Sequence, residues 1–274
     1  MKLSLSTGSL YFYPLRAIFR IAKETGFAGV ELVATPEAFL RGGSYVRRLS
    51  KEYGLSVFSV HPPLLYSRWC DVGKLVPRLV NLARESGCSL VVLHPPKKAK
   101  DLSQREGRRY VEAVKANHQR QGVRIAVENR AFFMEKDKYL ALSDLRELRA
   151  FADEHDLGMV LDTAHAGTST YNLLEAYDIF NARLVNVHLS DIRHLPPLLD
   201  SPYLHTYIKH HQMPGQGWLP LMELVQALNR DGYNGPLTLE LSPVALGIWW
   251  PPRARENLKK CVALIREWGV GIRD

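Results

Sequence analysis

The sequence has 274 residues, a formal net charge of +8 and a pI near 9.4. Its hydrophobic content of 46% and charged content of 23% are ordinary for a soluble globular protein. No apolar run approaches the roughly 20 residues of a membrane-spanning helix, and the N-terminus lacks the pattern of a signal peptide. Three widely separated cysteines (Cys70, Cys88 and Cys261) form neither a disulfide framework nor a CxxC metal site. A membrane protein is therefore excluded, and a cytoplasmic location is expected.

The basic residues are spread along the chain, in short clusters such as Lys97-Lys98 and Arg108-Arg109. A positive net charge is compatible with nucleic acid or with a phosphorylated substrate. Because no long basic stretch is present, each cluster is better interpreted as solvated surface. Nucleic acid is thus a less favoured partner than a small molecule.

Taken in order, the chain repeats one strand–helix unit. Apolar runs typical of buried parallel strands occur at 3–6, 29–33, 56–60, 89–93, 124–127, 159–161, 184–187 and 236–240. Helical patterns follow them at 15–25, in a basic stretch ending at 53, near 72–86, and at about 102–120, 143–154, 173–180 and 253–268. One further helix is expected after a long irregular loop, 191–218.

Eight such units in about 250 residues fit a (β/α)₈ TIM barrel, an α/β fold. An open doubly wound sheet would usually carry a glycine-rich phosphate turn after the first strand, and Ser6-Thr7-Gly8-Ser9 is not G-x-G-x-x-G. No linker or low-complexity segment divides the chain. We therefore expect residues 1–274 to form one barrel domain.

The segment Met159–Gly167 places Asp162 at the carboxyl end of a strand and His165 in the turn beyond it. Ligands bind at this rim in parallel α/β folds. An Asp with a nearby His suits a divalent metal, although an Asp that only caps the next helix is the simpler interpretation of one such motif.

The same arrangement recurs around the chain. Potential metal ligands end six successive predicted strands: His61, His94, Glu128, Asp162, His188 and Glu240. The first four follow one another at intervals of about 33 or 34 residues, one βα unit each. Because a barrel brings its strand ends into one ring, these residues predict a centre for Mn, Mg, Co or Zn.

These residues also resemble a known family. The motifs Glu128-Asn129, Leu161-Asp162-Thr163-Ala164-His165, His188-Leu189-Ser190-Asp191 and His211-x-x-Pro214-Gly215-Gln216-Gly217, with His61, His94 and Glu240, are similar to the xylose isomerase-like TIM-barrel superfamily. That superfamily holds sugar and sugar-phosphate isomerases and epimerases, cyclitol dehydratases and AP endonucleases of the endonuclease IV type. The resemblance covers nearly the whole chain.

The isomerase and epimerase members imply one metal held by Glu128, Asp162, His188 and Glu240. Glu128 and Glu240 would then act as acid and base on opposite sides of a substrate carbon, through an enediolate. His165 would bind substrate oxygens or a second metal. A metal-dependent sugar isomerase or epimerase is the interpretation we favour.

The endonuclease IV members imply an alternative, a zinc-dependent AP endonuclease with three metals. Its further ligands would be His61, His94, His165 and His211. The ninth ligand of that pattern, an Asp, is Lys209 here, and an ammonium group cannot bind a metal unless it loses its proton. The third metal site, and with it the phosphodiester reaction, is thereby less favoured.

Three loop residues are candidates for substrate binding. Arg130 follows Glu128 closely, and Trp69 and Trp249 lie in the loops after the third and eighth predicted strands. A tryptophan in such a loop can stack on a sugar ring or pack between barrel and helix. The sequence leaves the sugar, the metal and the oligomeric state open.

Overall fold

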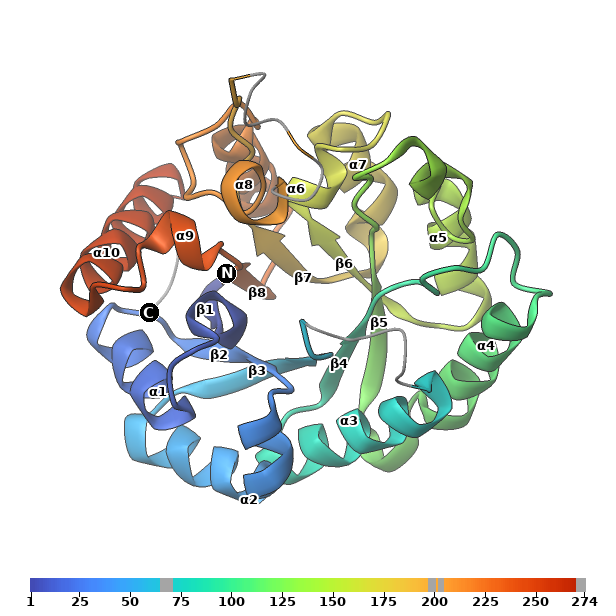
Figure 1. Ribbon diagram of the computed structural model, residues 1–274, viewed down its shortest axis with the longest axis horizontal. Helices are drawn as coiled ribbons and strands as arrows, with labels where there is room; N and C mark the ends of the chain where they lie inside the picture. Colours follow the sequence, from blue (N-terminus) through green and yellow to red (C-terminus); the bar gives the residue numbers. More distant parts are fainter. Residues whose placement is uncertain (65–70, 197–200, 202–204, 270–274) are drawn as a thin grey trace.

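The computed structural model describes residues 1–64, 71–196, 201 and 205–269. Its eight parallel strands close into a barrel in chain order, with β8 beside β1, and helices surround them (Figure 1). The (β/α)₈ barrel predicted from the sequence is confirmed. The strands are β1 Lys2–Ser6, β2 Gly29–Val33, β3 Ser56–His61, β4 Leu90–Leu93, β5 Arg124–Glu128, β6 Gly158–Asp162, β7 Leu184–Leu189 and β8 Pro236–Leu239.

The surrounding helices agree with the predicted pattern to within a few residues. Within the described residues, none of them is long and apolar enough to cross a membrane. The main helices are α1 Leu15–Glu24, α2 Pro36–Tyr53, α3 Val72–Ser86, α4 Arg105–Asn117, α5 Leu145–Glu154, α7 Leu173–Phe180, α8 Leu221–Arg230 and α10 Pro251–Trp268. Two single-turn helices, α6 Thr163–Ala166 and α9 Pro243–Leu246, follow β6 and β8.

Helix α4 is shorter than the predicted span of 102–120. Asp101 accepts a hydrogen bond from the backbone of Ser103 (2.6 Å), which stabilises a turn where the helix was expected to begin. At the other end, His118 has an extended backbone (φ −61°, ψ 135°). The expected irregular loop between β7 and α8 also contains one short π-helix, His205–Lys209.

Local capping explains where other helices begin and end. Asn172 and Glu175 form a reciprocal capping box at the start of α7. Helices α2 and α3 end at Gly54 and Gly87, both in the left-handed conformation that glycine adopts without strain. These signals fix the helices between successive strands, and so bring the strand ends to one rim.

The main apolar core lies between the barrel and its helices, and the barrel interior is different in character. A small apolar cluster of Val92, Ala126 and Val160 fills the interior beside β4–β6. Fully buried polar side chains from β1–β3, β7 and β8 face one another elsewhere: Ser4, Ser6, Glu31, Ser59, Asn186, His188 and Thr238. A buried polar cluster in one part of a barrel requires specific hydrogen bonds.

The contact between α2 and α3 generates a stability prediction. A Cβ atom on Gly43 would lie 2.5 Å from Cβ of Glu85 and 2.6 Å from the carbonyl oxygen of Leu82. We expect Gly43→Ala to lower the free energy of unfolding by about 1–3 kcal/mol, because the helices must separate. Ser44→Ala, on the exposed face of the same helix, should change it by less than about 0.5 kcal/mol. Urea denaturation of both variants measures the difference, and equal stability would contradict the close helix packing.

Candidate metal centre

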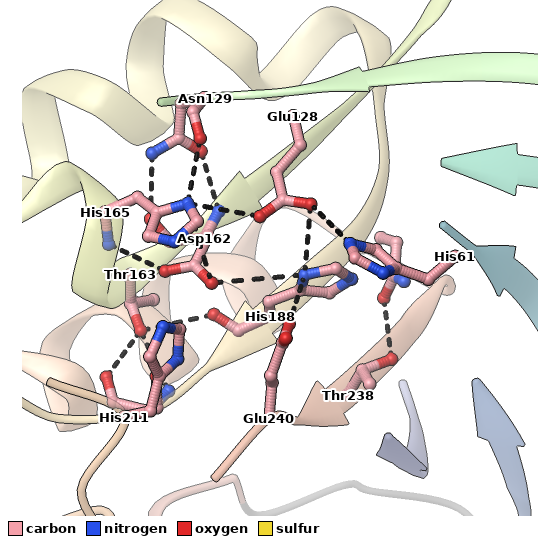
Figure 2. Close-up of polar contacts among 12 residues, drawn as sticks. His61, Glu128, Asn129, Asp162, Thr163, His165, His188, His211, Thr238 and Glu240 are labelled. Carbon is pink, nitrogen blue, oxygen red and sulfur yellow. Dashed lines mark hydrogen bonds and ion pairs between the residues drawn. The ribbon is translucent and has the colours of Figure 1, made fainter. Parts of the chain in front are cut away.

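The barrel brings all six predicted strand-end residues to one rim. They are His61, Glu128 and Asp162 as the last residues of β3, β5 and β6, His188 one residue before the end of β7, and His94 and Glu240 directly after β4 and β8. Asp162 and His188 are also paired in register across β6 and β7, so their side chains leave the sheet side by side. Figure 2 shows the side chains of His61, Glu128, Asp162, His188 and Glu240 pointing toward one another.

Glu128 is the hub of this arrangement. Its Oε2 atom lies 3.5 Å from Nδ1 of His188, 3.6 Å from Nε2 of His61 and 3.8 Å from Nδ1 of His94. Its Oε1 atom lies 3.2 Å from Nδ1 of His165. One buried carboxylate therefore faces four imidazoles that come from four different strand ends.

The ligand atoms divide into three groups, each with its atoms within 4.8 Å of one another. Glu128 belongs to two groups and Asp162 to two. The groups are His61 with His94 and Glu128, then Glu128 with Asp162, His188 and Glu240, and finally Asp162 with His165 and His211.

Two of the imidazoles are oriented by backbone carbonyl groups. Nδ1 of His61 lies 2.7 Å from the carbonyl oxygen of Pro62, and Nδ1 of His165 lies 2.9 Å from that of Asn129. A carbonyl oxygen can only accept, so the ring nitrogen facing it donates. The other nitrogen, Nε2, is then the one that can bind a cation or a substrate.

Two further imidazoles are oriented by side chains. Nδ1 of His211 lies 3.2 Å from Oγ of Ser190, and Nε2 of His188 lies 2.9 Å from Oε2 of Glu31. His188 is thereby turned the opposite way from the others, with Nδ1 toward the centre. Protein ligands to metals usually have their outer nitrogen held in this manner.

The unsatisfied polar atoms test whether a cation fits. Both carboxylate oxygens of Glu128, Oδ2 of Asp162, Nδ1 of His188 and Oε2 of Glu240 are buried and make no hydrogen bond. Buried polar atoms are normally hydrogen-bonded, because leaving one unpaired is unfavourable by about 1–3 kcal/mol. All five atoms belong to one group of oxygen and nitrogen donors, and such a set fits a divalent metal.

The pKa values of the imidazoles reflect this charge density. Burial favours the neutral form, but the adjacent carboxylate of Glu128 and the charges of the other nearby glutamates raise the pKa of His61 to about 9. For His165, burial is outweighed by the charge of Asp162 and by Glu128, and the pKa rises to about 9. Burial lowers the pKa of His94 to about 3. In the absence of a metal, the rings of His61 and His165 therefore carry positive charge next to the carboxylates, and the ring of His94 is neutral.

The carboxylates respond in opposite directions. Burial would raise the pKa values of Glu128 and Glu240, but neighbouring imidazoles hold both well below the usual range. For Glu128 these are His94 and His188, and for Glu240 it is His188. The pKa of Asp162 is raised, chiefly by burial. Without a metal, the two ionised glutamates are thus balanced by the protonated imidazoles beside them.

Asn129 joins β5 to β6 next to the centre. Its Oδ1 accepts from the backbone N–H of Asp162 (2.7 Å), and its Nδ2 donates to the carbonyl oxygen of Asp162 (3.0 Å). Asp162 in turn accepts from the backbone N–H of His165 (2.7 Å) and caps α6. The expected helix-capping role of Asp162 is therefore real, and it leaves the second oxygen, Oδ2, facing the centre.

The loop between β7 and α8 brings His211 to the rim. Asp191 and Gln212 form an antiparallel bridge, with both backbone hydrogen bonds at 2.9 Å. The backbone N–H of Ser242, after β8, donates to the carbonyl oxygen of His211 (2.7 Å). Lys209 ends the π-helix two residues before His211 and is not part of the third group.

Of the three predicted substrate-binding residues, Arg130 and Trp249 lie in the described part of the chain. Arg130 donates from Nη2 to the carbonyl oxygen of Pro96, and its pKa is lowered by burial. Trp249 is 71% exposed, which disfavours the alternative of packing between barrel and helix. Trp69 lies outside the described residues.

Sequence reasoning missed Glu31, which contacts His188 from the far side of the ring. Glu31 lies in the middle of β2 and is fully buried. The available signal was a single acidic residue in the otherwise apolar strand Gly29–Val33. A charged residue at a position buried on both sides of a parallel strand is rare unless it is paired.

Residues 19–264 match the family described as "Xylose isomerase-like TIM barrel". The chain belongs to this family. An uncharacterized protein of Mycobacterium tuberculosis is 30% identical over 268 residues, which cover 88% of this chain and 89% of the relative.

Two solved structures resemble the family fold as it is seen here. The 3-keto-D-glucoside 4-epimerase of E. coli is 21% identical, with a TM-score of 0.72 and coverage of 97% of this chain and 99% of that one. The D-psicose 3-epimerase of Clostridium cellulolyticum, solved with D-tagatose, is 16% identical, with a TM-score of 0.69 and coverage of 97% and 99%. At these identities the two structures show a shared fold.

We expect a metal to bind most tightly at the group of Glu128, Asp162, His188 and Glu240. We expect Asp162→Ala and Glu240→Ala to abolish tight divalent-metal binding, because each removes one of four donors and a negative charge. The barrel should remain folded, since the rim is separate from the packed core. Elemental analysis after gel filtration measures the bound metal. Glu223→Ala, at an exposed position of helix α8, is the control. Stoichiometric metal in both rim variants would refute the assignment.

The pair His61 and His94 predicts a second site that shares Glu128. Their Nε2 atoms lie 3.0 Å apart, close to the roughly 3.3 Å expected between two nitrogens bound at 2.0–2.1 Å to one tetrahedral zinc. We expect the double variant His61→Ala/His94→Ala to bind about one zinc per chain fewer than the wild type in a zinc titration. His194→Ala, exposed in the β7–α8 loop, is the control. If all three proteins bind the same number of zinc ions, the two imidazoles contact only substrate.

Proposed function

We propose that this protein is a divalent-metal-dependent isomerase or epimerase of a small sugar or sugar phosphate. The observation that carries the proposal is the group of Glu128, Asp162, His188 and Glu240, whose inward atoms are buried and without hydrogen bonds. Membership of the xylose isomerase-like family supports it, as do the epimerases among the similar structures.

Glu128, Asp162, His188 and Glu240 would hold the metal. Three carboxylates and one imidazole suit Mn, Mg, Co or Zn, and the donor set does not choose among them. When bound, the metal would polarise the substrate carbonyl and the adjacent hydroxyl and stabilise negative charge on them.

The two glutamates would move the proton. They come from β5 and β8, which lie apart in the barrel order, and each is held ionised by imidazoles next to it. One carboxylate would take the proton from the substrate carbon next to the carbonyl, leaving an enediolate. For the first outcome, the other carboxylate, protonated from solvent, would give its proton to the opposite face of the same carbon, and the first would release its proton to solvent. For the second, the first carboxylate would return its proton to the neighbouring carbon while a hydroxyl proton passes between the two substrate oxygens. The first outcome is epimerisation, and the second is isomerisation.

His165 would orient the substrate. Its Nδ1 faces the carbonyl oxygen of Asn129 and the carboxylate of Glu128, and its side chain is 12% exposed. The remaining nitrogen, Nε2, is then able to bind a substrate hydroxyl at the rim. Arg130 and Trp249 stay candidates for holding the distal part of a sugar, Arg130 through a phosphate and Trp249 by stacking.

A zinc-dependent AP endonuclease is the alternative, and one observation favours it. Asp162, His165 and His211 form a third group although Lys209 replaces the usual Asp. Cleavage of abasic DNA also needs an extended basic surface around the rim. Arg47, Arg48, Lys51 and Arg84 gather around a depression between α2 and α3. These residues lie in the C-terminal halves of the two helices, next to the strand starts and far from the rim.

Solvent exchange separates the two functions. We expect the metal-loaded protein to exchange the proton next to the carbonyl of at least one ketose or aldose with heavy water, because an enediolate must form. NMR across a panel of sugars and sugar phosphates measures this, and Glu128→Gln should slow it at least about 100-fold by removing an acid–base group.

The same preparation is assayed on abasic duplex DNA in a gel. Little or no incision is expected. Efficient metal-dependent incision, with no exchange across the panel, would reverse the ranking of the two functions.

A further inference from the structure

The two ring nitrogens of His188 face different carboxylates. Nδ1 lies 2.9 Å from Oε2 of Glu240, 3.5 Å from Glu128 and 4.0 Å from Asp162, on the side of the proposed metal. Nε2 lies 2.9 Å from Oε2 of Glu31, on the barrel-interior side. The ring and Glu31 are both fully buried, so water does not compete for either nitrogen.

Glu31 is held so that one oxygen receives three donors. Oε2 accepts from Oγ of Ser59 (2.7 Å) and from Nδ2 of Asn186 (3.3 Å) as well as facing Nε2 of His188. The hydroxyl of Thr238 donates to Oδ1 of Asn186 (2.9 Å), and this fixes the amide with its NH₂ toward Glu31. Because Ser59 and Asn186 both donate to Oε2, this oxygen is an acceptor, and the nitrogen of His188 that faces it at 2.9 Å is then a donor.

The outer partner of His188 is a carboxylate that does not itself belong to the proposed metal ligands. His61 has a neutral backbone carbonyl at the outer nitrogen, and His211 has the hydroxyl of Ser190. Nδ1 of His165 has the carbonyl oxygen of Asn129 at 2.9 Å and, at 3.2 Å, the proposed ligand Glu128. A carboxylate on the outer nitrogen fixes the tautomer more firmly and makes the inner nitrogen a stronger base. Among the described rim residues, the imidazole with such a partner is His188, which is also the one imidazole of the four-residue group.

We propose that Glu31 is a positioning residue that fixes Nδ1 of His188 as a metal-binding nitrogen and thereby sets the affinity of the four-residue group for its metal. The inference rests on the proposed function only in that a divalent metal binds this group. Glu31 acts through His188. Glu31 itself is not a metal ligand and does not act on the reacting carbon. Its remaining oxygen, Oε1, is buried and makes no hydrogen bond.

Two substitutions separate the charge of Glu31 from its shape. Glu31→Gln can still present a carbonyl oxygen to the three donors, so the fold is retained while the negative charge is lost. Glu31→Leu also removes the acceptor. Loss of an outer partner of this kind typically weakens metal binding by about 10–100-fold, so we expect about 10-fold for Gln and about 100-fold for Leu.

Ser4→Val is the matched control. Ser4 is fully buried in the same part of the barrel interior, and its hydroxyl makes no hydrogen bond within the described residues. The larger side chain should perturb the barrel interior but change metal affinity by less than about three-fold, because Glu31 and its donors are kept.

The experiment measures zinc and manganese dissociation constants by chelator competition, for the wild type and the three variants. A second readout is the imidazole N–H proton of His188 in NMR of the zinc-loaded proteins. In the wild type it should resonate far downfield and exchange slowly, and in Glu31→Leu it should move upfield or exchange too fast to observe. A purely structural role would lower the stability of the variants without moving either readout.

The outcomes are distinct. Weaker metal binding in both Glu31 variants, with Ser4→Val near the wild type, supports the inference. Unchanged affinity and an unchanged His188 resonance in Glu31→Gln and Glu31→Leu overturn it and leave the proposed function standing. Equal weakening in Ser4→Val also overturns it, because the effect would then come from general loosening of the barrel. A wild type that binds neither metal refutes the proposed function, and the inference with it.

Discussion

The structure depends on how one imidazole is surrounded by four carboxylates. His188 lies within 4.0 Å of Glu31, Glu128, Asp162 and Glu240, of which the first three are fully buried and Glu240 is 14% exposed. Removing a carboxylate from water is unfavourable by several kcal/mol unless donors or cations replace the water. Without a metal, the imidazoles of the rim supply the positive charge, because the carboxylates raise the pKa values of His61, His165 and His188. A divalent cation bound to the unpaired inward oxygens would take over this role from the protonated rings.

The two sides of the barrel interior differ in polarity. On the side of β4–β6 the interior is apolar and packs without hydrogen bonds, whereas hydroxyl and amide side chains from β3, β7 and β8 converge below Glu31. Within the described residues, Oε2 of Glu31 accepts hydrogen bonds, whereas its Oε1 and the hydroxyls of Ser4 and Ser6 make none. The donors to Oε2 of Glu31 are themselves held by other strands, so the support of His188 is a property of the closed barrel and not of any one βα unit.

Whether the contacts of a residue are local or long-range decides whether its role could be predicted from the sequence. His61, Glu128, Asp162 and His188 end apolar strands, and their position depends only on the local pattern and on barrel closure, both of which are visible along the chain. Glu31 could not be assigned in the same way, because its partners Ser59 and His188 are 28 and 157 residues away. The shortening of α4 was missed for the opposite reason, since a very local turn at Asp101 overrode a helical pattern.

The loop that carries His211 shows how local sequence and long-range structure combine. His211 has a left-handed backbone (φ 53°), which is unfavourable by about 1 kcal/mol or more for a residue with a side chain. It is stable there because the β7–α8 loop is anchored on Asp191, whose carboxylate accepts from the backbone N–H groups of Ile192, Gly215, Gly217 and Leu219.

The glycines of the Pro214-Gly215-Gln216-Gly217 segment make this anchoring sterically feasible. A Cβ atom on Gly217 would lie 2.3 Å from Oδ1 of Asp191 and 2.1 Å from the carbonyl oxygen of Ile192, and Gly215 has a φ of +80°. Only glycine lets the backbone approach the carboxylate this closely. The motif that looked in the sequence like part of a ligand set is thus mainly a device that wraps the chain around Asp191. Its chemical consequence is indirect: it delivers one imidazole to the rim against the local preference of the backbone.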